Sequence, residues 1–365
     1  MNINFANLNL QYLKYKDEID SKIQEVLNSS NYIMGTQVYD LEKNLENFTG
    51  VNHAITCSSG TDALTLSMMA LDIKPGDEVI TTPFSFISTA ETIALLGAKP
   101  VFVDIEPDTF NIDANKIESK ITKKTKIIMP VSLFGQPADI NLIKQISDKY
   151  KLNIIIDGAQ SFGSYFLDKM DSNLGDISTT SFFPAKPLGC YGDGGAIFTN
   201  KEDYFEKLKL LRVHGQNKRY QHKYIGLGGR LDTIQAAILL VKLKYFKNEI
   251  KQRQKIADRY SKELSGQFIK PLIKKNSKST WSQYTIRTQK RDILHLKLKE
   301  LGIPTAIYYP IPLHLQDCFK SLNYKVGDLP VSEKAAQEVI SLPINAFMKD
   351  EIDLIINKIN SINIF

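Results

Sequence analysis

One lysine of the chain stands among residues that favour a low pKa and the close approach of a ligand. Lys186 is flanked by an alanine and a proline, and four glycines fall within residues 189–195. Because few carboxylates are nearby in the sequence, its ammonium can be poorly hydrated, and its pKa then falls and the neutral amine becomes a nucleophile. The apolar runs 177–183 and 196–199 predict buried strands, so Lys186 is expected on a loop between strands. A solvated loop lysine without a chemical role is the alternative interpretation.

A carboxylate follows another apolar run. Asp157 comes directly after the three isoleucines at 154–156 and is expected at the carboxyl end of a strand, where the ligands of parallel sheets gather. A desolvated carboxylate there needs a partner, so Asp157 either anchors a cationic group or caps the following segment. Gln160, three residues further, can cap or reach the same ligand.

Small hydroxyl residues open a predicted helix after an earlier strand. The segment 58–63 is Ser-Ser-Gly-Thr-Asp-Ala, with Thr61 near its centre. Free backbone N–H groups and the positive end of the helix dipole suit a phosphate at this position. Ordinary helix capping explains the same residues equally well.

The elements that position these residues alternate between strand and helix. Two amphipathic helices, around residues 19–27 and 38–48, come first. Strands are predicted at 53–57, 78–81, 100–103, 126–130 and 153–156, and helices at 60–70, 86–96 and 139–150. This alternation predicts an α/β protein in which a mostly parallel sheet is covered by helices on both faces.

The chain changes character after a long helical pattern that runs from residue 232 towards 260. A short strand at 281–287, a helix at 292–301, an extended segment at 303–309 and helices at 332–340 and 350–359 follow it. We therefore predict a large domain over residues 1–245, with the N-terminal helices, and a smaller C-terminal α+β domain over residues 246–365.

Composition narrows the classes of function. The 365 residues carry a formal net charge of +6 that is spread along the chain, without a basic cluster or module typical of nucleic-acid binding. Three cysteines lack metal-ligand spacing, so we expect reduced thiols and no metal. No apolar run reaches membrane-spanning length and no leader is evident, which predicts a cytoplasmic protein without a membrane partner.

Together these residues suit one cofactor, pyridoxal 5′-phosphate. Lys186 can form a Schiff base with its aldehyde, Asp157 can keep its pyridine nitrogen protonated, and the turn at Thr61 can hold its phosphate. The segment 58–63 lacks the lysine pattern of ATP-binding loops, and the glycines within 189–195 do not form the dinucleotide fingerprint. ATP and NAD are therefore disfavoured.

Six segments in order along the chain resemble the DegT/DnrJ/EryC1/StrS family of sugar aminotransferases. They are SGTDAL at 59–64, PFSF at 83–86, DGAQ at 157–160, the lysine stretch at 181–195, RLDTIQAA at 230–237 and YPIPLH at 309–314. The resemblance covers essentially the whole chain. It implies a fold type I, aspartate aminotransferase-like architecture with a seven-stranded sheet, and a homodimer with active sites at the interface.

The resemblance also implies roles around the cofactor ring. Lys186 would be the catalytic lysine that binds the aldehyde and moves the proton, and Asp157 would pair with the pyridinium. Gln160 would contact the ring oxygen and Phe86 would stack on the ring, although Phe86 could equally be a core residue.

The remaining roles concern the phosphate and the substrate. Thr61, the backbone N–H of Asp62 and Ser181 would hold the phosphate, with Gly60 beside them. The implied substrate-binding residues are Arg230, Tyr308, Tyr309 and His314.

The chain departs from the family pattern at two places. Gly158 replaces a common alanine or cysteine, which we expect to be tolerated. Gly228 and Gly229 stand where many relatives carry an asparagine that crosses the dimer interface, so no role is transferred there.

The resemblance implies transfer of an amino group from L-glutamate to a keto nucleotide sugar. The segment 181–189 with Gly-Asp-Gly-Gly at 192–195 resembles the subgroup that aminates C3 of a UDP-2-acetamido-3-oxo-hexose or hexuronate for bacterial surface polysaccharides. A C4 aminotransferase, or one for dTDP-linked 3-keto-6-deoxy sugars, is the alternative. A regulatory protein that binds pyridoxal phosphate is the non-enzymatic alternative.

Overall fold

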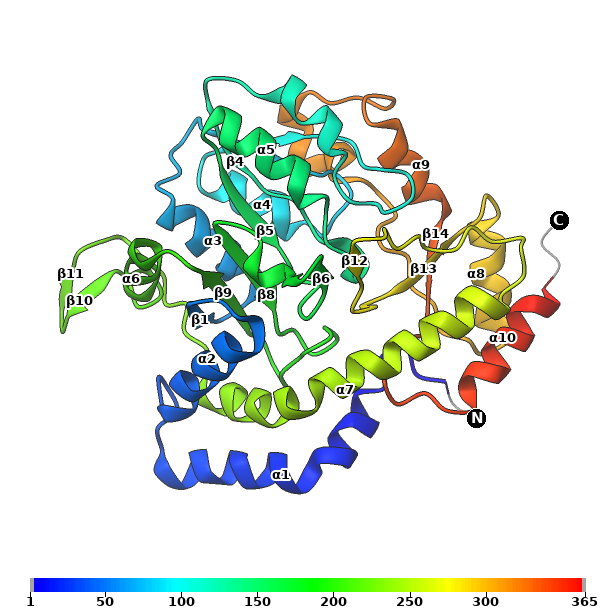
Figure 1. The fold of residues 1–365 in the computed structure, drawn as a ribbon, viewed down its shortest axis with the longest axis horizontal. Coiled ribbons are helices and arrows are strands. Elements are labelled where there is room, and N and C mark those ends of the chain that lie inside the picture. Colours follow the sequence, from blue (N-terminus) through cyan, green and yellow to red (C-terminus); the bar gives the residue numbers. More distant parts are fainter. Residues whose placement is uncertain (1–2, 363–365) are drawn as a thin grey trace.

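The computed structural model describes residues 3–362, and a seven-stranded sheet lies at its centre (Figure 1). The strand order is β1-β9-β8-β5-β4-β2-β3. The strands are β1 (His53–Cys57), β2 (Glu78–Thr81), β3 (Lys99–Phe102), β4 (Thr125–Ile128), β5 (Asn153–Asp157), β8 (Ile177–Ser181) and β9 (Gly195–Thr199). β9 is antiparallel to both β1 and β8, and the other neighbours pair in parallel. The predicted mostly parallel seven-stranded sheet is therefore confirmed.

Helices cover both faces of this sheet, as the strand and helix alternation predicted. On one face, alternate strand residues such as Ile55 and Ile155 pack against α3 (Gly60–Ala70), α4 (Ser88–Leu95) and α6 (Glu202–Leu211). On the other face, strand residues such as Ala54 and Ile156 face α2 (Thr36–Thr49), α5 (Ile140–Tyr150) and the first half of α7 (Thr233–Glu263). α1 (Leu8–Ser29) packs along α7 (Figure 1).

The second half of α7 belongs to a separate hydrophobic cluster near the C-terminus. There Ile256 and Tyr260 pack against β13 (Tyr284–Arg287), β14 (Val339–Leu342), α8 (Arg291–Glu300) and α10 (Glu351–Ser361). α7 is thus one continuous helix across the proposed boundary at residues 245 and 246, and Phe246 still packs on the large-sheet side. The two-domain division remains a proposal.

The helices and the strand predicted near the C-terminus are present, with somewhat different bounds. The helix predicted at 332–340 is α9 (Pro330–Glu338), and the chain then enters β14, which pairs antiparallel with β13. An apolar run of four residues does not distinguish a strand from a helix end, so only the pairing reveals it. The extended segment at 303–309 forms one bridge, Ala306 to Ser341, and no strand.

The shorter elements escaped the sequence analysis. A three-stranded sheet joins β6 (Tyr165–Phe166), β7 (Lys169–Met170) and β12 (Ser277–Lys278), and β10 (Gln216–Lys218) pairs with β11 (Gln221–His222) in a projecting hairpin (Figure 1). The 3-10 helices are Ala114–Lys116, Glu118–Lys120, Leu133–Gly135, Asp171–Asn173, Leu313–Leu315 and Asp317–Leu322.

Within residues 3–362, no helix is long and apolar enough to cross a membrane. The same residues include no group of three or more His, Cys, Asp or Glu side chains placed to hold a metal ion.

Candidate active site

Lys186 lies on a tightly closed loop between β8 and β9, the position predicted for it. The N–H of Cys190 donates to the carbonyl of Phe182 at 2.7 Å, and the N–H of Phe182 donates to the carbonyl of Gly194 at 2.7 Å. The N–H of Lys186 donates to Phe183 at 2.8 Å inside this loop. Desolvation lowers the pKa of Lys186, while the nearby carboxylate of Asp157 opposes that shift. The amine is therefore less strongly protonated than a solvated lysine.

Asp157 ends β5 and is buried, with both carboxylate oxygens already oriented. Oδ2 accepts a hydrogen bond from Oγ1 of Thr89 at 2.7 Å, and Oδ1 accepts from the N–H of Ala159 at 3.2 Å. The Thr89 hydroxyl also lies 2.9 Å from Oγ of Ser85. Burial raises the pKa of Asp157, and the hydrogen bonds from Thr89 and Ala159 and the charge of Lys186 oppose this rise. The carboxylate is held in one orientation beside the lysine loop.

The first turn of α3 lies against the end of β8. A Cβ added to Gly60 would stand 2.7 Å from Cβ of Ser181, so only glycine fits this approach without a shift. Oγ1 of Thr61 lies 2.8 Å from Oγ of Ser88, which brings several hydroxyl groups to this helix N-terminus. Backbone N–H groups and hydroxyls at such an end suit the phosphate of the cofactor. In this conformation the N–H of Asp62 is occupied by Oγ of Ser59 at 3.0 Å.

Gln160 and Tyr309 form a second pair near Asp157. Oε1 of Gln160 accepts from the N–H of Phe134 at 2.9 Å, and its Nε2 donates to the Tyr309 hydroxyl at 3.1 Å. The ring of Phe86 lies 6.4 Å from that of Tyr309 and is 56% exposed. The core-packing alternative for Phe86 is therefore wrong, and its ring is free to contact a ligand.

The residues predicted to bind substrate do not all gather in one place. Nη1 of Arg230 lies 3.2 Å from Nε2 of His214, and its Nε is buried without a partner in the described structure. Gly229 precedes it, and its carbonyl accepts from the N–H of Ser58 at 3.1 Å, so Arg230 lies on the α3 side of the site. Tyr308 is partly buried beside Phe5, with ring centroids 6.5 Å apart.

His314 lies apart from the other candidates. Its side chain is fully buried, and Nε2 is 3.2 Å from Oε1 of Glu333. This conformation leaves no surface of His314 for a substrate to contact. Its predicted substrate-binding role therefore remains a prediction without support from its position.

Two residues that support the site were not predicted from the sequence. Thr89 donates to Asp157, and Ser85 contacts the Thr89 hydroxyl; their spacing of four residues at the start of a predicted helix is the one signal that could have revealed them. At Gly158 a Cβ would stand 2.7 Å from the carbonyl oxygen of Thr179, so glycine fits this position without a shift; its tolerance in the reaction remains a prediction.

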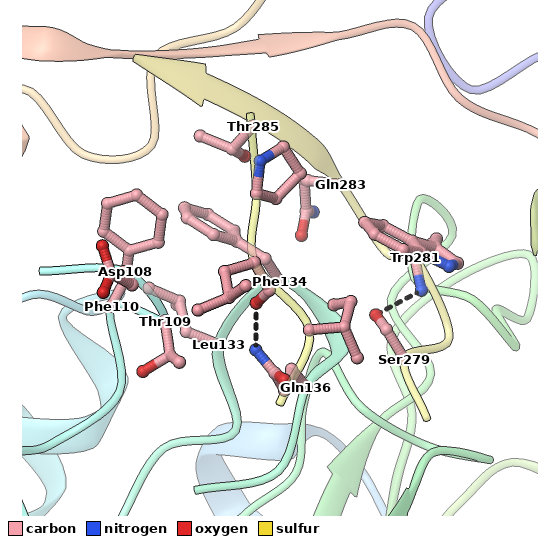
Figure 2. Close-up of a pocket in the computed structure, with 13 residues that line it drawn as sticks. Asp108, Thr109, Phe110, Leu133, Phe134, Gln136, Ser279, Trp281, Gln283 and Thr285 are labelled. Atoms are coloured by element: carbon pink, nitrogen blue, oxygen red, sulfur yellow. Dashed lines mark hydrogen bonds between the residues drawn. The ribbon is translucent and has the colours of Figure 1, made fainter. Parts of the chain in front are cut away.

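A cavity close to Gln160 contains none of the predicted site residues (Figure 2). It separates the turn that carries Phe134 from the segment leading into β13, and Figure 2 shows Phe110 and Trp281 on opposite sides of it. Its lining residues are Asp108, Thr109, Phe110, Leu133, Phe134, Gln136, Pro271, Leu272, Ile273, Ser279, Trp281, Gln283 and Thr285. The lysine and its carboxylate are instead at the ends of the sheet strands, where α/β enzymes carry their chemistry.

A loop lysine of lowered pKa beside a buried strand-end carboxylate, on this sheet, defines a fold type I enzyme that uses pyridoxal phosphate. Residues 14–360 match the model of the DegT/DnrJ/EryC1/StrS aminotransferase family, and the chain belongs to that family.

Individual relatives cover nearly the whole chain. The UDP-2-acetamido-2-deoxy-3-oxo-D-glucuronate aminotransferase of Pseudomonas aeruginosa is 48% identical over 95% of this chain and 96% of its own. A pleiotropic regulatory protein of Geobacillus stearothermophilus is 45% identical over 96% of this chain and 95% of its own. The crystal structure of NtdA from Bacillus subtilis with bound cofactor PMP superposes with a TM-score of 0.91 at 32% identity, covering 98% of this chain and 84% of that one.

Proposed function

We propose that this sugar aminotransferase moves the amino group of L-glutamate to C3 of a UDP-linked 2-acetamido-3-oxo-hexose or hexuronate. The observation that carries the proposal is the pairing of Lys186, whose pKa burial lowers, with the buried carboxylate of Asp157. The Gly-Asp-Gly-Gly run at 192–195 and the name of the Pseudomonas relative support the C3 position and the UDP-sugar. We place the reaction in the cytoplasm, in surface-polysaccharide synthesis.

The side chains divide the work between proton transfer and orientation. When bound, pyridoxal phosphate supplies an electron-accepting ring that stabilises negative charge on the carbon bearing the amino group. Nζ of Lys186 carries the proton to and from that carbon, and its lowered pKa makes the neutral amine more accessible than in a solvated lysine. Asp157 would pair with the ring nitrogen, and its negative charge would keep that nitrogen protonated. One lysine thus serves both halves of the reaction.

Other residues hold the reacting groups in place. Thr61, Ser181 and the first turn of α3 would hold the phosphate, with Gly60 allowing their close approach. Gln160, whose amide is hydrogen-bonded to Phe134 and Tyr309, would contact the ring oxygen. Phe86 would cover the ring face.

Arg230 and the tyrosines are the proposed substrate contacts. The unpartnered Nε of Arg230 supports a role in binding an anionic group, because a buried guanidinium N–H without an acceptor is costly. Tyr309 lies between Gln160 and Phe86, which supports a contact with the sugar, and Tyr308 adjoins it.

A homodimer is part of the same proposal. Tyr220 and Ile225, in and just after the hairpin of β10 and β11, are 80% and 91% exposed, and Phe183 in the lysine loop is 52% exposed. Large apolar side chains left in solvent support a surface that a second copy covers.

The first experiment is the visible absorption spectrum of the purified protein with its cofactor, before and after glutamate, beside the variant Lys186→Ala. We expect a yellow band that glutamate bleaches in the wild type alone, with turnover lowered about 10⁴-fold or more in the variant. A panel of 3-keto and 4-keto sugars linked to UDP or dTDP then identifies the acceptor. Retained turnover in Lys186→Ala contradicts the assignment.

A regulatory role is the second candidate, because one relative of high identity bears the name of a pleiotropic regulatory protein. A regulator that binds the cofactor shows the yellow band but no bleaching by glutamate and no amination of any sugar in the panel. Bleaching together with sugar amination excludes it as the main function.

A further inference from the structure

Lys242 is a buried lysine outside the residues that the proposed reaction uses. It lies in the first half of α7, it is 2% exposed, and its neighbours Leu239 and Phe246 belong to the hydrophobic cluster under the sheet. Burial lowers the pKa of Lys242 to about 8. A buried ammonium is costly unless it is hydrogen-bonded, so its partner indicates why it is there.

That partner belongs to the loop that carries Lys186. Nζ of Lys242 donates to the backbone carbonyl of Gly189, and it lies 5.0 Å from the ring centroid of Tyr191. Gly189 packs closely against the start of the loop, since a Cβ there would stand 2.4 Å from the carbonyl oxygen of Pro184. Gly189 is therefore folded back onto the residues immediately before Lys186.

A second side chain of α7 holds the same loop. Oε1 of Gln235 accepts a hydrogen bond from the N–H of Tyr191 at 2.8 Å. Gln235 and Lys242 are seven residues apart, which places them on the same face of the helix. One acceptor and one donor on that face thus bind an N–H and a carbonyl of the loop.

We propose that Lys242 is a positioning residue: its buried ammonium binds the carbonyl of Gly189 and thereby holds the loop so that Lys186 stays in place beside Asp157. The inference rests on the proposed function, since Lys186 is there the residue that moves the proton. Gln235 supports the same loop from about two helical turns away, and the charge of Lys242 makes its hydrogen bond the stronger of the two.

The test compares Lys242→Met, Lys242→Arg and the matched control Lys251→Met, an exposed lysine on the same helix. Methionine fills a similar space without a donor and leaves the Gly189 carbonyl unpaired, so we expect a thermal unfolding midpoint lower by only a few degrees. We expect faster amide exchange in residues 183–192 and kcat lower by about 10-fold or more with KM nearly unchanged. Arginine, which restores the cation, should recover part of kcat, and Lys251→Met should match the wild type.

The proposal would be overturned if Lys242→Met kept the wild-type kcat and the wild-type amide exchange. It would also be overturned if the Lys251→Met control lost as much kcat as Lys242→Met. If Lys242→Met does not fold, the exchange of the unmodified holoenzyme decides. Residues 183–192 should then exchange much more slowly than the hairpin at 216–222, and equal rates contradict the anchoring of the loop. The exchange data do not depend on turnover, so they separate failure of this inference from failure of the proposed function.

Discussion

Two groups of residues around the site differ in their contacts: one, here called the floor, is buried and hydrogen-bonded within the chain, and the other is exposed to solvent. The floor comprises Asp157, Thr89, Gln160 and Tyr309, which are joined by hydrogen bonds within this chain or lie against one another. The exposed set comprises Phe86, Phe183, Tyr220 and Ile225, all of which are more than half in solvent. A side chain that is hydrogen-bonded within the chain is oriented before any ligand binds, whereas an exposed apolar side chain is buried only when a ligand or partner covers it. The floor residues are therefore pre-oriented for the reaction, and the exposed residues are available to a ligand or a partner.

The largest effect should come from removing the charge on the floor. Asp157→Asn keeps the shape and both oriented positions, so we expect the cofactor to stay bound while kcat falls about 10²- to 10³-fold. The measurement is the absorbance of bound cofactor beside steady-state turnover. Unchanged rates would remove the pyridinium role of Asp157 and reduce the floor to a packing feature.

A smaller effect should follow from removing a hydrogen bond to the Asp157 carboxylate. Thr89→Val removes the hydroxyl that donates to Oδ2 of Asp157, and hydrogen bonds to charged groups contribute about 1.5–3 kcal/mol. The carboxylate is then less stabilised, so its pKa rises further and it becomes protonated at a higher pH. We expect kcat about 10-fold lower and the acid limb of its pH profile moved to higher pH.

The matched control for that variant is Thr92→Val on the same helix. The Thr92 hydroxyl is also buried, but it donates to the carbonyl of Ser88 at 2.8 Å rather than to Asp157. An acid limb that moves equally in both variants would assign the effect to α4 as a whole. An unmoved limb in Thr89→Val would remove the electrostatic role of the hydroxyl.

The smallest effect on folding should come from the exposed set. The double variant Tyr220→Ser and Ile225→Ser removes apolar surface that the chain itself does not bury, so the free energy of unfolding should change by about 0.5 kcal/mol or less per site. Sedimentation should nevertheless show a weaker dimer. A loss of stability without any change in sedimentation would mean that these residues support the hairpin and not a partner.

The sequence predicted the parts of the fold that local pattern determines. The strand at 53–57 and the helices at 60–70 and 139–150 end close to where the structure ends them, because alternation and spacing are local signals. The loop position of Lys186 and the strand-end position of Asp157 were predictable for the same reason. Resemblance added Phe86, which no periodicity marks, and assigned Gln160, already a candidate from its spacing to Asp157, to the ring oxygen.

Contacts between distant segments were not predictable from one sequence. Thr89 meets Asp157 across 68 residues and Lys242 meets Gly189 across 53, and neither pair shares a local pattern. His314 lies in a motif matched to the family, yet its side chain is buried against Glu333, because packing and not sequence position decides exposure. The pairing of β13 with β14 likewise depends on residues that are brought together only in the folded chain.

The order of strands in the central sheet also constrains how the protein is made. β1 is the first strand to leave the ribosome, but its partner in the sheet is β9, the last of the seven to be synthesised. The packing partner of α1 is synthesised later still, since α1 packs along α7. The apolar surfaces of β1 and α1 therefore stay exposed on the nascent chain until these partners are synthesised. Exposed apolar surfaces of this kind bind chaperones or aggregate. The loop that carries Lys186 directly precedes β9, so the sheet closes and Lys186 reaches its position at the same late stage of folding.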